Sequence, residues 1–156
     1  MITATDLFGN QHKIDVGEIQ QSFRVSIYGI AVENGQALIL PDRLGYSWPG
    51  GKIDKGEDHV KALKREFKEE TGLDIEPVKI LNMYTSIFKS GNGNYYHTLM
   101  IYYKVRIVGG QIATTGFEGD EKEHLKKAEW VDLSKIRKMK HQCTLNISDE
   151  ILKLAR

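Results

Sequence analysis

Residues 51–73 read GKIDKGEDHVKALKREFKEETGL and predict a helix that follows a glycine turn. At about 100° per residue, the apolar side chains of this segment share one sector of a helix over residues 58–71, which can face a core. These apolar side chains are Val60, Leu63 and Phe67. Gly72 is predicted to close the helix, because glycine takes the left-handed conformation just past a helix end.

Three glutamates, Glu66, Glu69 and Glu70, lie beside that apolar sector. Spacings of three and four residues bring carboxylates close on a helix surface, at a cost of about 0.2–0.5 kcal/mol per like-charged pair. A divalent cation reverses this cost, because Mg²⁺ takes hard carboxylate oxygens and keeps part of its coordination for water and phosphate. Just before the helix, the Gly50-Gly51 pair lets the backbone approach a ligand closely, and Lys52 adds a cation.

The rest of the chain predicts a single α/β domain over residues 1–156, with a mixed sheet and helices packed on its faces. Residues 1–22 predict a short N-terminal arm or hairpin with a turn at Gly9-Asn10. Strands are predicted at 23–32, 36–40, 78–88, 95–108 and 128–131, and further helices at 133–139 and within 145–155. Residues 41–50 predict a loop, because two prolines and two glycines suit neither element.

The segment 95–108 alternates with a period of two. Tyr95, Leu99, Ile101 and further odd-numbered positions face one side, while Lys104 faces the other. We therefore expect only one face of this strand to be buried.

Charge and cysteine content limit the possible partners. The chain has 22 basic and 21 acidic residues, a net charge of +1, which removes the bulk electrostatic attraction to nucleic acid or an anionic membrane. The sequence has neither a run of about 18 apolar residues nor a secretory signal. Cys143 is the single cysteine, so a cytoplasmic protein without a membrane partner is expected. The assembly stays open between a monomer and a homodimer.

The spacing of charged residues and glycines in residues 51–73 resembles the signature of the Nudix hydrolase family. That signature is a Gly, five residues, a Glu, seven residues, Arg-Glu, a hydrophobic residue, any residue, Glu-Glu, any residue, Gly and a hydrophobic residue. This chain fills every specified position, with Gly51, Glu57, Arg65, Glu66, Phe67, Glu69, Glu70, Gly72 and Leu73. A chance match is on the order of 10⁻⁷ at ordinary residue frequencies. The element order over roughly residues 23–139 also looks like the whole Nudix domain.

This resemblance implies an α/β/α sandwich around a mixed β-sheet, and Mg²⁺- or Mn²⁺-dependent hydrolysis of a phosphoanhydride in a nucleoside diphosphate-linked small molecule. Water would attack phosphorus, with two or more ions present when substrate is bound. The implied metal ligands are Glu66, Glu69, Glu70 and the carbonyl of Gly51. Arg65 would orient the acids, Glu57 would support them from the loop, and Lys52 would lie near the phosphates.

The resemblance leaves the general base open between Glu66 and a glutamate on the acidic loop at 114–124, where Glu123 is nearest the expected place and Glu121 is second. Arg43 and Trp48 are candidates for binding substrate, the first through a phosphate and the second through the nucleotide. Other aromatic candidates for stacking on a base are Tyr46, Phe88, Tyr95 and Tyr96.

Markers of substrate class outside the signature are absent. For example, Phe88-Lys89-Ser90 stands where Nudix members resembling ADP-ribose pyrophosphatases carry a proline. The sequence is therefore closest to the nucleoside triphosphate or nucleotide-sugar branches. Two alternatives stay open: a nucleotide-binding module without catalysis, and an RNA 5′-end pyrophosphohydrolase. The second would use a local basic patch, formed by Lys135, Arg137, Lys138 and Lys140, against an otherwise neutral charge.

Overall fold

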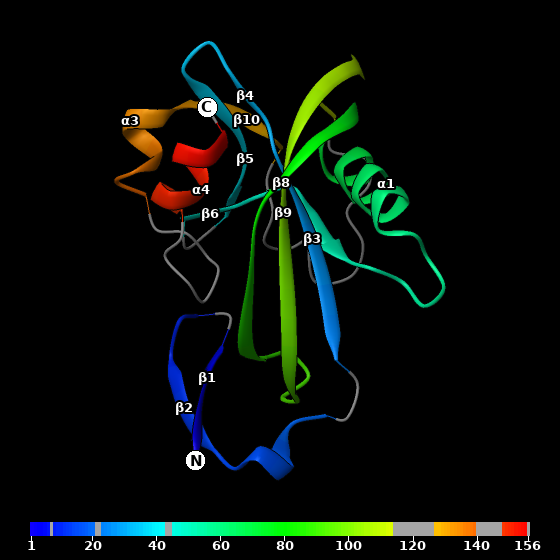
Figure 1. The fold of residues 1–156 in the computed structure, drawn as a ribbon. Helices are drawn as coiled ribbons and strands as arrows, with labels where there is room; N and C mark the ends of the chain where they lie inside the picture. The colour runs from blue at the N-terminus through cyan, green and yellow to red at the C-terminus, as the bar shows by residue number, and fades with distance from the viewer. Residues whose placement is uncertain (7, 21–22, 43–44, 114–126, 140–147, 156) are drawn as a thin grey trace.

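A computed structural model describes residues 1–6, 8–20, 23–42, 45–113, 127–139 and 148–155. Its long central strands lie between α1 on one side and α3 and α4 on the other, as Figure 1 shows. An N-terminal hairpin, β1 and β2, lies at the far end of these strands from α1. No helix in the described ranges is long and apolar enough to cross a bilayer.

The secondary structure runs in the following order. The elements are β1 (Ile2–Asp6), β2 (Gln11–Ile14), η1 (Val16–Glu18), β3 (Arg24–Ile30), β4 (Val32–Glu33), β5 (Gln36–Asp42), β6 (Gly45–Ser47), β7 (Gly50–Lys52), α1 (His59–Thr71), β8 (Leu73–Lys89), β9 (Tyr95–Gly110), β10 (Glu129–Asp132), α3 (Leu133–Ile136) and α4 (Ser148–Ala155).

Two sheets organise the described strands. The first has the order β2-β1-β8-β9-β3-β7, and the second has the order β10-β5-β4, with β6 paired to β5. The pairs β1–β8 and β3–β9 are parallel, and the other pairs are antiparallel. The predicted mixed sheet is therefore confirmed, and β1 and β2 pair as an antiparallel hairpin near the N-terminus.

Helix α1 begins and ends where the sequence predicts. The Asp58 carboxylate accepts hydrogen bonds from the backbone N–H groups of Val60 and Lys61, which satisfies two donors that a helix start leaves free. Gly72 ends the helix in the left-handed region, with φ 78°. Between these caps, Leu63 and Phe67 are fully buried in one of two core clusters. The amphipathic pattern thus fixes α1 on the sheet.

The second core cluster lies on the opposite side, under α3 and α4. It contains Tyr46 and Trp48 from the segment around β6, together with Met100 and Tyr102 from β9. The rings of Tyr46 and Trp48 meet edge to face, with centroids 5.3 Å apart. This packing covers the face of the sheet that α1 leaves open.

The loop predicted at 41–50 is wrong in part. Pro41 pairs with Tyr46 across β5 and β6, and Gly50 begins β7, which pairs with β3. Proline and glycine are local signals for turns, but pairing with distant strands decides here. Strand β8 likewise begins before the predicted residue 78 and includes Pro77, where its register with β9 shifts. A proline is tolerated at such an irregularity because the ladder is already interrupted.

The prediction that β9 has a single buried face is wrong. Tyr103 and Val105 are buried toward α1, but Thr98, Met100 and Tyr102 are buried on the opposite face. The second core cluster covers Met100 and Tyr102 on that face. Helix α3 also ends at Ile136, before the predicted residue 139, while α4 forms within residues 145–155 as expected. The predicted acidic loop at 114–124 lies outside the described residues.

Candidate active site

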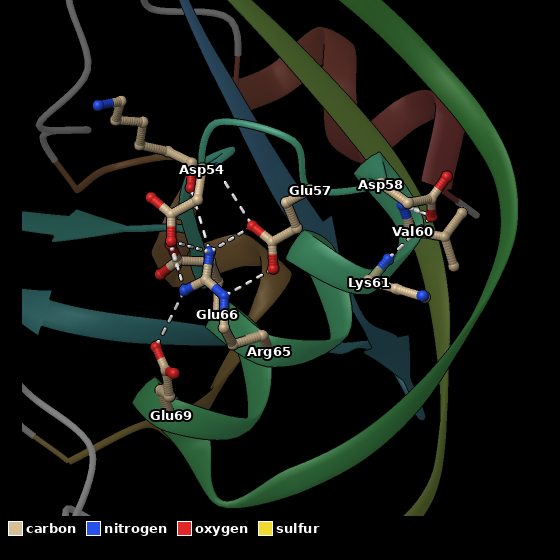
Figure 2. A network of polar contacts seen from close by, with 9 residues as sticks. Asp54, Glu57, Asp58, Val60, Lys61, Arg65, Glu66 and Glu69 are labelled. Atoms are coloured by element: carbon tan, nitrogen blue, oxygen red, sulfur yellow. Dashed lines mark hydrogen bonds and ion pairs between the residues drawn. The ribbon is translucent and has the colours of Figure 1, made fainter.

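Four acidic side chains of α1 and of the segment before it, those of Asp54, Glu57, Glu66 and Glu69, surround the guanidinium group of Arg65 (Figure 2). Arg65 Nε and Nη2 donate to the two carboxylate oxygens of Glu57, each at 2.8 Å. Nη1 donates to Glu66 at 2.9 Å and to Glu69 at 3.2 Å. One cation thus holds three carboxylates, and Nη2 also donates to the Lys52 carbonyl at 3.3 Å.

The bidentate pair between Arg65 and Glu57 is the strongest contact of this cluster. Hydrogen bonds from Arg65, and one from the Asp54 backbone N–H, lower the pKa of Glu57 to about 2. The hydrogen bond to Glu57 and the charge of Glu66 raise the pKa of Arg65 above its ordinary value. Both groups are therefore ionised at neutral pH, and the loop before α1 is fixed to the helix.

Glu66 lies directly against the backbone of Gly51. A Cβ atom at position 51 would stand 2.7 Å from the Glu66 carboxyl carbon, too close for contact. Only glycine therefore leaves room for the carboxylate at this point of β7. The side chain of Glu66 is 14% exposed, so the group reaches solvent over a small area.

Glu70 is attached to the same glycine turn by a different bond. Its Oε2 accepts a hydrogen bond of 2.7 Å from the Gly50 backbone N–H, although the residue is almost buried. Gly50 has φ 143°, and a Cβ there would lie 2.1 Å from the Ile27 carbonyl oxygen of β3. The last turn of α1 is thus tied to a backbone position that only glycine can occupy.

The donor set matches a hard divalent cation in kind, because it consists of carboxylate oxygens beside a backbone that approaches closely. Within the described ranges, no three acidic, histidine or cysteine side chains stand together closely enough to hold a metal ion as they are placed. Arg65 and Gly50 engage the carboxylates of Glu66, Glu69 and Glu70 instead. The assignment of these three glutamates and the Gly51 carbonyl as ligands stays a prediction.

The predicted substrate-binding residues have different positions. Lys52 is exposed at the end of β7, next to Gly51. Trp48 is 1% exposed and packs in the core, so its ring presents no free face in this structure, and a stacking role for it stays a prediction. Tyr46 is also buried, while Phe88, Tyr95 and Tyr96 are half-buried at the far ends of β8 and β9.

Three predicted site residues, Arg43, Glu121 and Glu123, lie outside the described residues. Lys140 of the candidate basic patch does so as well. Of the remaining patch, Arg137 contacts Asp149 of α4 at 3.4 Å.

Two contributions to the cluster were not predicted individually from the sequence. The Gly50 backbone N–H binds Glu70, and Asp54 contacts Arg65 at 3.7 Å. Asp54 belongs to the acids of residues 52–57, which indicate further carboxylates near the helix start. The Gly50 N–H could not be predicted in this way, because a backbone donor is present at almost every residue.

Comparisons with known proteins agree with this arrangement. A model of the NUDIX domain matches residues 22–151. The ADP-ribose pyrophosphatase of Methanocaldococcus jannaschii is 28% identical over 151 residues, covering 88% of this chain and 83% of that protein. The mRNA-decapping enzyme subunit 2 of Saccharomyces cerevisiae is 27% identical over 142 residues, covering 85% of this chain but 14% of that protein.

Solved structures share the fold. A NUDIX hydrolase from Nitrosomonas europaea superposes with a TM-score of 0.66 at 17% identity, covering 85% of this chain and 88% of that one. A MutT NUDIX hydrolase from Burkholderia pseudomallei gives a TM-score of 0.62 at 20% identity, covering 87% of this chain and 100% of that one. The predicted α/β/α architecture is confirmed by these likenesses.

Proposed function

The chain belongs to the NUDIX domain family of pyrophosphohydrolases, and on that premise we propose that it hydrolyses a phosphoanhydride bond in a nucleoside diphosphate-linked small molecule. Water attacks phosphorus, and the substrate is of the nucleotide-sugar or nucleoside triphosphate type. The observation that carries this proposal is the set of carboxylates that Arg65 and the glycine turn position at one end of α1.

Nudix hydrolases generally use divalent metals, and the donor set here fits Mg²⁺ or Mn²⁺, with two or more ions in the substrate complex. Glu66, Glu69, Glu70 and the Gly51 carbonyl would hold them. When bound, such ions neutralise phosphate charge and stabilise the leaving oxygen. To bind an ion, Glu69 would have to leave its hydrogen bond with Arg65. The two hydrogen bonds from Arg65 to Glu57 can stay in place during this change and hold the guanidinium group.

The chain's own residues supply the remaining steps of the proposed reaction. A carboxylate must accept the proton of the attacking water, and Glu66 and Glu123 are the two candidates, with Glu121 as a third. In this proposal Lys52, which follows Gly51 in β7, binds a phosphate oxygen. We propose the cytoplasm as the location, because a single cysteine cannot form an internal disulfide. The proposed chemistry is compatible with either a monomer or a homodimer.

ADP-ribose is the first substrate to test, because the Methanocaldococcus relative that aligns with most of this chain carries that name. The missing proline noted after the signature argues against it, so UDP-glucose and the nucleoside triphosphates belong in the same panel. Hydrolysis of RNA 5′ ends is the second candidate. The alignment with the yeast decapping subunit favours it, and a 5′-triphosphorylated RNA tests it.

The test is turnover of this panel with Mg²⁺ or Mn²⁺, scored by which product forms, for the wild type and for Glu70→Gln. The substitution keeps an acceptor for the Gly50 N–H but removes a ligand charge, so kcat should fall by roughly 100-fold or more with the fold intact. Glu76→Gln is the matched control, because Glu76 pairs with Lys64 away from the cluster.

Near-normal turnover by a folded Glu70→Gln variant would contradict the proposed metal chemistry. A wild-type protein that gains thermal stability with nucleotide, yet releases no product, would instead be the binding module without catalysis.

A further inference from the structure

The second buried face of β9 contains a hydroxyl group to which the described residues offer no hydrogen bond. Thr98 is 5% exposed, and its Oγ1 has no partner within the part of the chain that the structure describes. Buried polar groups are nearly always paired, because burial without a partner costs free energy. This hydroxyl is therefore a candidate for a ligand contact, and its surroundings show which ligand.

Arg24 is the neighbour of Thr98 across the β3–β9 pair. Its guanidinium makes two weak contacts: Nε donates to Ser26 Oγ at 3.3 Å, and the group lies 5.8 Å from the centre of the Phe88 ring. No carboxylate of the described residues pairs with it. A half-buried arginine without an acidic partner can turn toward an anion at little cost.

Lys52 extends the positive charge along the same face. It pairs with Ser26 across β3 and β7, and Ser26 lies two residues along the strand from Arg24. Arg24 and Lys52 are therefore diagonal neighbours, with their backbone positions about 7–8 Å apart. Cross-strand partners and alternate residues share one face, which is also the face of Thr98. The cationic strip thus starts beside the glycine turn and runs away from it.

Tyr96 lies on this face as well, two residues before Thr98. Hydrogen bonds from Asn92 and Asn94 lower the pKa of Tyr96, and the charges of Arg24 and Lys52 lower it further. A field that stabilises a phenolate also stabilises any other anionic oxygen at that position.

We propose that Arg24, Thr98 and Tyr96 form a subsite that binds a phosphate group of the substrate other than the one that is attacked. In this subsite Arg24 turns from Ser26 toward the phosphate, and the Thr98 hydroxyl donates a hydrogen bond to it. Tyr96 borders the phosphate, and Lys52 links this subsite to the acidic cluster. The inference rests on the proposed function, since the ligand is part of the same substrate.

The subsite is tested by calorimetric titration in metal-free buffer, with adenosine, AMP, ADP and ATP as the probes. The wild type should bind more tightly as phosphates are added. Arg24→Gln should lose about 10-fold or more of that gain, because a charged hydrogen bond is removed. Thr98→Val should lose a smaller part, and Arg106→Gln, an exposed arginine of β9, should bind as the wild type does.

The Thr98→Val variant also separates a ligand role from a packing role. Valine has the shape of threonine and removes an unpaired buried hydroxyl, so the thermal stability of the free protein should be kept or raised. A packing role predicts unchanged affinity and KM, whereas the subsite predicts a raised KM with kcat largely kept.

The outcomes separate this inference from the proposed function. If Arg24→Gln and Thr98→Val bind every probe as the wild type does, or if added phosphates do not tighten wild-type binding, the subsite is overturned whatever the turnover. If no substrate is hydrolysed but both variants weaken phosphate-dependent binding, the subsite stands and the hydrolase proposal fails.

Discussion

Two arginines near β7 differ in how fully their surroundings use them. Arg65, on α1, donates to three carboxylates and one backbone carbonyl. Arg24, on β3, donates one long hydrogen bond to a serine and lies over an aromatic ring. The first guanidinium has nearly all its donors engaged inside the protein, whereas most donors of the second have no partner among the residues that the structure describes.

This difference distinguishes an arginine that positions other side chains from an arginine that can bind a ligand. A cation whose donors are already engaged fixes other side chains and contributes to folding, but it has little left to offer a ligand. A cation with weak internal contacts contributes little to folding and keeps its donors for a ligand. The acidic cluster around Arg65 should therefore respond to mutation in stability and geometry, and the sheet face around Arg24 in affinity.

The largest expected effect on this comparison comes from replacing each arginine by glutamine. Arg65→Gln leaves the carboxylates of Glu57, Glu66 and Glu69 facing one another without the cation that positions them. Tm should therefore fall by about 5 °C, and the affinity for Mn²⁺ should fall by about 10-fold or more. Arg24→Gln should leave Tm within about 2 °C of the wild type. Differential scanning calorimetry and Mn²⁺ titration followed by electron paramagnetic resonance measure both quantities.

The conservative variant Arg65→Lys serves as the control for charge. It should recover part of the stability but not the metal affinity, because lysine cannot make the bidentate contact with Glu57. Equal loss of Tm in the Arg65→Gln and Arg24→Gln variants would remove the distinction between the two regions.

A smaller effect is expected from a single added methyl group at Gly51. Gly51→Ala forces the Glu66 carboxylate to move, since the new Cβ would stand 2.7 Å from it. The end of a flexible side chain can move without unfolding the protein, so kcat should fall by about 10-fold while Tm changes little. Steady-state kinetics and thermal unfolding of the same preparation check both statements.

Gly17→Ala is the matched control, because nothing lies within 4 Å of a Cβ at that position. It should leave both turnover and Tm as they are. Unchanged turnover in Gly51→Ala would show that the position of Glu66 beside β7 is unimportant for catalysis.

The smallest expected effect is a stabilisation by Glu57 that is present at neutral pH and lost in acid. Because the pKa of Glu57 is lowered from 4.5 to about 2, its ion pair with Arg65 stabilises the fold fully above pH 4.5. That contribution is lost as the pH falls from 4.5 toward 2, since the folded state then takes up a proton later than the unfolded state does. Urea unfolding of wild type and Glu57→Gln should differ at pH 6 and converge near pH 2.

A difference that persists unchanged at the lowest pH would mean that Glu57 acts through packing and not through its charge.

The sequence predicts the bounds of α1 well because the signals are local. Asp58, Gly72 and the apolar spacing of Leu63 and Phe67 define the helix within one continuous segment. Helical geometry then places Glu66, Glu69 and Glu70 near one another without reference to the rest of the fold.

The remainder of the site depends on contacts between distant segments. Strand β7 forms because it pairs with β3, although Gly50 and Pro49 are local signals for a loop. Met100 and Tyr102 are buried because residues of β6, α3 and α4 complete the second core cluster around them, which a period of two in β9 cannot indicate. The hydrogen bond from Gly50 to Glu70 has no sequence signal at all.

The hydrogen bond between Gly50 and Glu70 joins two residues that are twenty positions apart in the sequence and so closes a loop of chain. Arg65 braces the same loop from inside through the Lys52 carbonyl and Glu57. The glycine turn and the last turns of α1 are thus linked to each other by polar contacts within one continuous segment. Residues 50–71 could therefore be grafted as one segment onto the edge of another sheet. The recipient strand would need to approach the glycine as closely as the Ile27 backbone approaches Gly50.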